Sequence, residues 1–272
     1  MAHPTSSDTP AFHVVVPSIP GFGPGDAPKK SGFGLAITAT AFKILMVTVL
    51  GYDKFVTQGT DWGAYITRSL AVQYPQHVKA CNINLMPCGP PAFYRAPLTM
   101  AGLILNSWLY TKREKQGLQN IMDYMREGDG YLKQQSTRPQ SLGFGLGDSP
   151  IGLLARLVDK FHDWMDVANY EMSEDEVITF VMMHWIQAAT PGLRYYKAAS
   201  QESGPTNMKN AFTTYHSTPV GMSNFPKEIA IPTPPPPPPP PRGGWVRSLR
   251  RPRPRTILLS SRRFRLSVHR VL

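Results

Sequence analysis

The segment GTDWG at residues 59–63 carries the chemistry that stands out first in this sequence. It lies between a strand-like run at 55–58 and a helix-like run at 62–74. A strained strand-to-helix turn exposes its central side chain at the carboxyl end of a sheet, and glycines on either side remove clashes with Cβ atoms. Asp61 is therefore a candidate nucleophile, with the Trp62 backbone N–H beside it to stabilise an oxyanion. The alternative is an ordinary tight turn in which Asp61 is the N-cap of the helix.

Residues 1–91 alternate strand-like and helix-like runs, which is typical of a parallel sheet with crossover helices. We expect strands at 12–16 and 78–85 and a long apolar helix at 33–50. Lys43 and several threonines interrupt this apolar run, so a buried helix is favoured over a membrane span.

The strand signal stops after residue 91, and apolar residues recur at three- and four-residue spacing up to about residue 200. The clearest helices are expected at 118–126, 150–164 and 174–189. Ser149 before Pro150 and Ser173 before an acidic triplet are typical N-caps. Helices that follow a strand-helix series predict a cap over an α/β core.

The chain has 272 residues, of which 42% are hydrophobic and 17% charged, as in a globular protein. Its net charge of +11 comes from a tail, because ten arginines and no acidic residue fall between 242 and 270. Residues 1–241 are close to neutral, so nucleic-acid binding by the folded part is not expected. Eight consecutive prolines at 234–241 precede the arginines, and this low-complexity tail is expected to be disordered. Cys81 and Cys88 have no Cys or His at zinc spacing, so neither a metal nor a cofactor is expected.

Several segments together resemble the microsomal-type epoxide hydrolases of the α/β-hydrolase fold, especially fungal members. They are FHVVVPSIPGFG at 12–23, QGTDWG at 58–63, GYLKQQSTRPQ at 130–140, DSPIGLLA at 148–155 and RYYK at 194–197. The resemblance covers roughly residues 10–232, and only the combination is specific.

The resemblance implies a partial α/β-hydrolase core with the nucleophile turn at 1–91, a helical cap at 92–203, a return toward the core at 204–232 and the tail at 233–272. It also implies that the Asp61 carboxylate attacks an epoxide carbon to give a hydroxyalkyl ester. Two cap tyrosines then protonate the alkoxide, and by position in the motifs these are Tyr131 and Tyr196. Tyr195 takes the second role if the register differs by one residue. Phenols suit this step because they stay protonated at neutral pH yet are far more acidic than an alkoxide.

The resemblance fails at both ends. The family hydrolyses the ester with a histidine in a Gly-Gly-His-Phe segment, oriented by an acidic residue, and has a His-Gly-x-Pro loop before the first strand, but neither segment occurs here. His269 follows the break without any acidic residue after Glu228. No base histidine and no acidic partner can be assigned, so we expect the chain to open one epoxide and stall as the ester, with the vicinal diol formed only by an intact enzyme.

Two other functions stay open. The core would also fit a haloalkane dehalogenase-like hydrolase, although the two tyrosines favour an epoxide. A non-catalytic interaction protein would instead use the proline and arginine tail. The expected partners are a small epoxide, of the kind met in epoxide detoxification and aromatic hydrocarbon catabolism, and water. A homodimer and membrane association stay open, and a cytoplasmic location is the default.

Overall fold

The computed structural model describes residues 11–85 and 110–223, together with the single positions 97, 101, 105, 108 and 225. Cys88 lies outside the described residues, as do the proline run and the arginines on which the interaction-protein alternative depends.

Three parallel strands form the sheet of the described residues, in the order β1-β2-β3. They are β1 (Phe55–Gly59), β2 (Val78–Ile83) and β3 (Val220–Met222). The helix α2 (Trp62–Gln73) connects β1 to β2 and packs on both strands. Parallel strands need such a crossover, and the expected parallel sheet with crossover helices is confirmed.

The strand expected at 12–16 is wrong. Residues 11–19 have no regular secondary structure, and Val14 and Val16 are 60% and 84% exposed. A β-branched run becomes a strand only where a neighbour accepts its backbone hydrogen bonds. None of the described strands pairs with this run.

The long apolar segment forms α1 (Leu35–Ile44), which continues as a π-helical segment at Leu45–Val49 and packs on α2. The Glu202 carboxylate accepts the backbone N–H groups of Leu35 and Ala36 at 3.0 and 2.9 Å. A carboxylate at a helix N-terminus satisfies free N–H groups and complements the helix dipole. Among the residues that the structure describes, no helix has the length and apolar character that a bilayer crossing requires.

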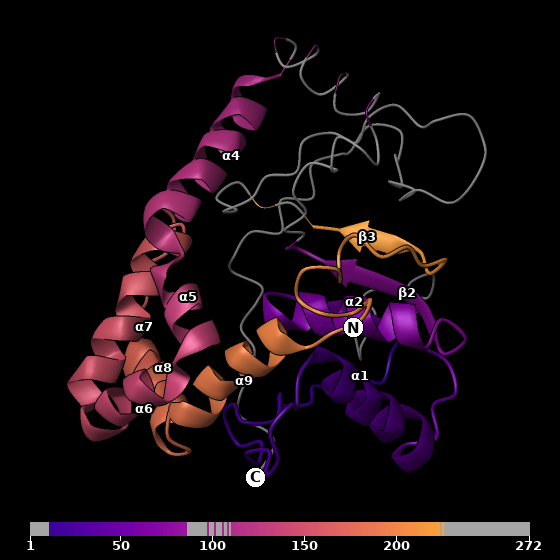
Figure 1. The fold of residues 1–272 in the computed structure, drawn as a ribbon, viewed down its shortest axis with the longest axis horizontal. Helices are drawn as coiled ribbons and strands as arrows, with labels where there is room; N and C mark the ends of the chain where they lie inside the picture. Colours follow the sequence, from indigo (N-terminus) through magenta and orange to yellow (C-terminus); the bar gives the residue numbers. More distant parts are fainter. Residues whose placement is uncertain are drawn as a thin grey trace.

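A block of helices lies beside the sheet and its two helices (Figure 1). The last helix of the block, α9, lies between the two parts in Figure 1. It packs on α5 and α6 and buries Tyr195 and Ala199 in the same apolar cluster as Trp62 of α2. The block comprises α4 (Lys112–Asp123), a π-helical segment (Tyr124–Gly128), α5 (Gly130–Thr137), α6 (Pro139–Asp148), α7 (Pro150–Trp164), α8 (Glu174–Trp185) and α9 (Thr190–Gln201).

Both expected N-caps are confirmed. The Ser149 hydroxyl accepts the Gly152 N–H at 3.0 Å at the start of α7. Ser173 forms a reciprocal capping box with Glu176 at the start of α8. The end of α8 differs from the expected position because Ala188 has a left-handed φ of +60°, which a continuous right-handed helix cannot contain.

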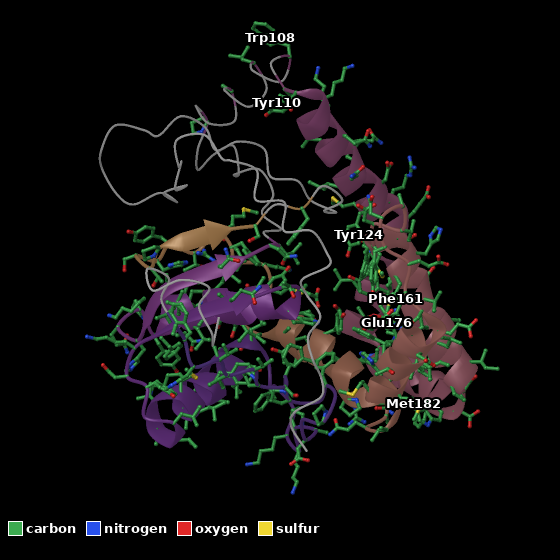
Figure 2. All side chains as sticks on the ribbon, turned by 180° about the vertical axis from the view of Figure 1, so that it is seen from behind. Trp108, Tyr110, Tyr124, Phe161, Glu176 and Met182 are labelled. Carbon is green, nitrogen blue, oxygen red and sulfur yellow. The ribbon has the colours of Figure 1, made fainter. Side chains whose placement is uncertain are left out.

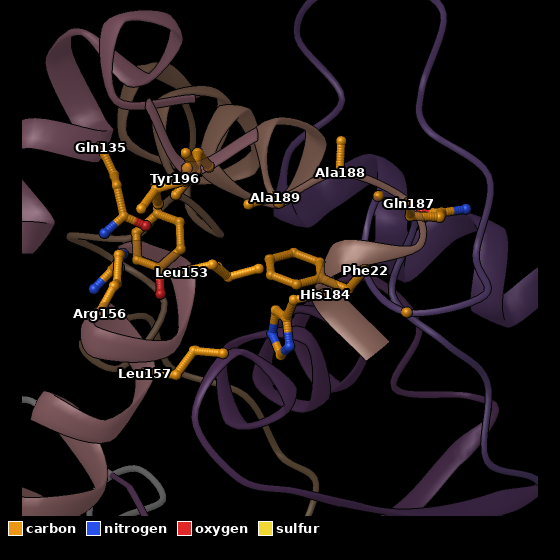
Figure 3. Close-up of a pocket in the computed structure, with 15 residues that line it drawn as sticks. Phe22, Gln135, Leu153, Arg156, Leu157, His184, Gln187, Ala188, Ala189 and Tyr196 are labelled. Carbon is orange, nitrogen blue, oxygen red and sulfur yellow. The ribbon is translucent and has the colours of Figure 1, made fainter. Parts of the chain in front are cut away.

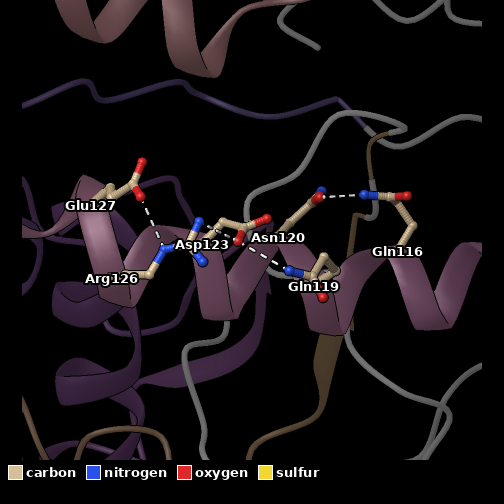
Figure 4. Close-up of polar contacts among 6 residues, drawn as sticks. All are labelled: Gln116, Gln119, Asn120, Asp123, Arg126 and Glu127. Carbon is tan, nitrogen blue, oxygen red and sulfur yellow. Dashed lines mark hydrogen bonds and ion pairs between the residues drawn. The ribbon is translucent and has the colours of Figure 1, made fainter.

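Side-chain pairs run along the surface of α4 and of the π-helical segment that follows it (Figure 4). Gln116 donates to Asn120 at 2.9 Å and Gln119 donates to Asp123 at 3.0 Å, each one helical turn further on. Arg126 pairs with both Asp123 and Glu127. Such pairs add only tenths of a kcal/mol each, about 0.2–0.5 in isolated helices.

Arg68 of α2 ties the segment after α9 to the core. Its guanidinium donates to the carbonyl oxygens of Ala211 and Thr214 and to Nε2 of His216. Since arginine can only donate, His216 is neutral in this pair. Burial, and then the positive charge of Arg68, lower the pKa of His216 to about 4.

We therefore expect the free energy of unfolding to fall as the pH drops from 6.5, the ordinary histidine pKa, to about 4. In this window His216 is protonated in the unfolded chain but stays neutral in the native protein, so acid favours unfolding. Urea unfolding at several pH values across the window measures the slope. His216→Gln keeps an acceptor for Arg68 without titrating and should flatten the slope; an unchanged slope would assign the acid sensitivity to other groups.

Candidate active site

The turn between β1 and α2 holds Asp61 in a strained backbone conformation. Its φ is +46° and its ψ −122°, a combination that residues other than glycine rarely adopt. The Asp61 side chain makes no capping hydrogen bond to α2, so the alternative of an ordinary N-cap does not fit the structure. Strain of this kind costs about 1–3 kcal/mol and is characteristic of functional residues.

The two glycines of the motif have different roles. A Cβ on Gly59 would lie 2.1 Å from the Gly63 carbonyl oxygen, so only glycine fits there. A Cβ on Gly63 would meet no described atom within 4 Å. The expected relief of a Cβ clash is therefore found at Gly59 and not at Gly63, because the N-terminal turn of α2 folds back over Gly59 alone.

Asp61 is exposed to solvent at the start of α2. The protein around its carboxylate is nevertheless close enough to remove part of the hydration of the charged form. Burial of the carboxylate raises the pKa of Asp61, and the nearby Trp62 backbone N–H acts in the opposite direction. A partly desolvated carboxylate is a stronger nucleophile than one fully hydrated by water.

Tyr196 and Tyr131 lie close to each other, and the charge of Asp61 reaches both. Tyr196 of α9 packs edge-on against the Trp62 ring, with 4.8 Å between ring centroids, and Tyr131 of α5 lies 6.2 Å from Tyr196 by the same measure. Burial, followed by the negative charge of Asp61, raises the pKa of Tyr196 to about 12. Burial is also the main cause that raises the pKa of Tyr131, and the charge of Asp61 contributes. Both hydroxyls thus remain protonated at neutral pH within the electrostatic reach of the carboxylate.

Tyr195 has a different position from its neighbour Tyr196. It is 2% exposed, and its hydroxyl donates to the Thr38 hydroxyl of α1 at 3.1 Å. This side chain connects α9 to α1, so the structure does not support the shifted register in which Tyr195 replaces Tyr196.

Three residues of the helical block that the sequence analysis missed lie around Tyr131. The hydroxyl oxygens of Tyr124 and Tyr131 share a hydrogen bond at 3.1 Å, and Tyr124 lies on the side of the helical block that faces the sheet (Figure 2). The cationic groups of Arg156 and Lys160 lie 5.5 and 5.1 Å from the centre of the Tyr131 ring. The four-residue spacing of the two cations on α7 was the only signal in the sequence, since it puts them on one helix face.

A pocket of about 100 Å³ opens beside Tyr196 (Figure 3). Its wall is mostly apolar, with polar groups from α5, α7 and the end of α8, and Asp61 is not among the lining residues. Gly192 shapes one side, since a Cβ there would come within 2.8 Å of the Phe22 ring. Tyr196 is therefore the residue that connects the Asp61 turn to this pocket.

Each histidine in the described ranges interacts with a group other than Asp61. His216 pairs with Arg68, and His184 contacts the carbonyl oxygen of Phe180. The remaining three have surface partners: His13 with Tyr52, His77 with Asp53 and His162 with Asp163.

Comparisons with known proteins identify the family of the chain. Residues 4–125 match the family model described as the alpha/beta hydrolase fold. Epoxide hydrolase 1 of Sus scrofa is 31% identical over 82% of this chain and 51% of its own length. A putative epoxide hydrolase of Stigmatella aurantiaca is 32% identical over 80% of this chain and 46% of its own length. The chain thus spans about half the length of the curated relatives that it matches.

Solved structures give the same result. The juvenile hormone epoxide hydrolase of Bombyx mori superimposes with a TM-score of 0.67 at 27% identity, over 79% of this chain and 52% of that one. The Aspergillus niger epoxide hydrolase superimposes with a TM-score of 0.63, also at 27% identity, over 80% of this chain and 52% of that one. By sequence and by fold, the chain belongs to the epoxide hydrolase family of the α/β-hydrolase fold.

Proposed function

We propose that this chain opens small epoxides by nucleophilic attack of Asp61 and holds the product as a hydroxyalkyl ester. The observation that carries the proposal is the strained Asp61, with two protonated tyrosines within the reach of its charge. Family membership supports the choice of an epoxide as substrate, because the matched relatives are named epoxide hydrolases.

In the proposed step, an Asp61 carboxylate oxygen forms a bond to one epoxide carbon. The C–O bond of that carbon breaks, and its electron pair goes to the epoxide oxygen. The Tyr196 hydroxyl gives its proton to this oxygen, with Tyr131 as the second donor, and the phenolate regains a proton from solvent. The Trp62 backbone N–H lies beside the carboxylate and would stabilise an oxyanion during later attack on the ester.

Release of the diol needs a water molecule activated by a base. The described histidines interact elsewhere, so we propose that ester hydrolysis is slow in this chain and that the ester accumulates. We also propose the division into a core at 1–91, a cap at 92–203, a return at 204–232 and a tail at 233–272, with α9 carrying Tyr196 at the boundary of cap and core.

Intact-mass spectrometry after incubation with an aryl epoxide tests this function. We expect the protein mass to rise by the mass of one epoxide, and peptide mapping to place the adduct on Asp61. Tyr196→Phe should slow adduct formation about 10- to 100-fold, and the double variant with Tyr131→Phe by about 10²–10⁴-fold, the usual contribution of general acid catalysis.

Tyr195→Phe is the matched control, because it removes a neighbouring hydroxyl that faces Thr38 and should leave the adduct rate unchanged. Continuous turnover to the diol without any adduct would refute the accumulated ester. An adduct on a residue other than Asp61 would refute the nucleophile.

A further inference from the structure

The pocket beside Tyr196 contains a buried side chain whose hydrogen bonding is incomplete. Gln135 of α5 lines the pocket and is 1% exposed. Its Nε2 donates to the Tyr131 carbonyl oxygen at 3.0 Å. Because a carbonyl oxygen can only accept, this bond fixes the orientation of the carboxamide. The Oε1 atom is buried and has no partner among the described residues.

Figure 3 shows the Gln135 oxygen on the side of the Tyr196 ring, with Arg156 at the same wall of the pocket. A buried amide oxygen without a partner costs about 1–3 kcal/mol, and native proteins rarely leave one unexplained. The α5 helix therefore holds a buried, unpaired acceptor in the wall of the pocket, and what this acceptor lacks is a donor.

The size and the apolar lining of the pocket limit which ligand groups could carry that donor. Apart from its polar groups the wall is apolar, with Leu146, Leu153, Leu157 and Leu193 from three helices and the Phe22 ring. A dry cavity of about 150 Å³ accepts benzene, so a pocket of about 100 Å³ takes a group of roughly four or five carbons. The fitting group is a compact alkyl or cycloalkyl substituent that carries a hydroxyl or an amide N–H.

We propose that Gln135 is a specificity-determining residue: its Oε1 accepts a hydrogen bond from a hydroxyl or amide N–H on an epoxide whose short apolar substituent fills this pocket. The inference rests on the proposed epoxide opening, because Tyr196 lines the pocket and is the proposed acid for that step. A site built around a buried acceptor discriminates strongly against an analogue that cannot donate, since the acceptor is then left unpaired.

Binding of two probes of almost equal size tests the acceptor directly. Cyclopentanol can donate a hydrogen bond and cyclopentanone cannot. In a ligand-observed NMR titration of the full chain, we expect cyclopentanol to bind at least about tenfold more tightly, as one buried hydrogen bond implies. Gln135→Met keeps the length of the side chain but removes the acceptor, and should abolish this preference.

Gln134→Met is the matched control, since Gln134 is exposed on the same helix and bonds the Arg138 carbonyl oxygen. It should keep the preference for the alcohol. Equal affinities of the two probes for the unsubstituted chain, or a preference that survives Gln135→Met, would overturn the proposal. The comparison in the unsubstituted chain decides the matter even if Gln135→Met does not fold.

A second arm separates this inference from the proposed function. An epoxide with a hydroxycyclopentyl group should form the Asp61 ester faster than its oxocyclopentyl counterpart, and Gln135→Met should equalise the rates. A Gln135-dependent preference for cyclopentanol without any ester would support the acceptor and refute epoxide opening. Ester formation without any preference for the alcohol would support epoxide opening and refute the acceptor.

Discussion

Asp61→Gly is expected to abolish ester formation and, at the same time, to stabilise the fold. Asp61 has a φ of +46° and a ψ of −122°, and glycine adopts such a conformation without a Cβ clash. Relief of about 1–3 kcal/mol of strain exceeds the roughly 0.5–1 kcal/mol that glycine costs through chain entropy. Removal of a carboxylate whose pKa is raised by burial adds to the gain. The net expectation is a rise of about 1 kcal/mol in the free energy of unfolding.

Urea denaturation measures the stability and intact-mass spectrometry measures the ester. Asp61→Asn is the control, because it removes the nucleophile but keeps the Cβ that causes the strain. It should form no ester and gain less stability than Asp61→Gly. If Asp61→Gly proves less stable than the unsubstituted chain, the carboxylate contributes native interactions that outweigh the backbone strain, and the strain is not held for function.

The local parts of this site could be predicted from the sequence. The strained turn and the bounds of α7 follow from short-range patterns, namely glycine spacing and the Ser149 cap. The strand expected at 12–16 failed because a strand depends on a partner that the run itself does not encode. The correct predictions concern structure that a short segment encodes by itself, whereas the wrong one concerns structure that needs a distant partner.

The roles proposed for the two tyrosines and for Gln135 could not be predicted from local sequence patterns. Family motifs pointed to Tyr131 and Tyr196, but no periodicity distinguishes them from other aromatic residues of the cap. The hydrogen bond between the Tyr124 and Tyr131 hydroxyls and the unpaired oxygen of Gln135 arise where separate helices meet. Such features depend on the packing of α5 against α9, which only the folded structure defines.

The position of Asp61 depends in turn on Gly59, and Gly59→Ala is expected to be the most damaging single substitution in this turn. The new Cβ would lie 2.1 Å from the oxygen and 2.2 Å from the carbon of the Gly63 carbonyl. Both atoms belong to the backbone, so no change of rotamer can relieve the overlap. Either the end of β1 or the start of α2 must move. We expect the loss in the free energy of unfolding to exceed the value typical of overpacking, which is about 1–3 kcal/mol.

Gly63→Ala makes the same chemical change four residues later and should have the opposite sign. Gly63 lies inside α2, and its Cβ would meet no described atom within 4 Å. Alanine in place of a helical glycine stabilises a helix by about 0.5–1 kcal/mol. Thermal unfolding of the two variants should therefore show a large loss for Gly59→Ala, with the ester lost as well, and a small gain for Gly63→Ala. Equal stabilities would mean that the turn relaxes freely, and the strain at Asp61 would then be too weak to hold the carboxylate in place.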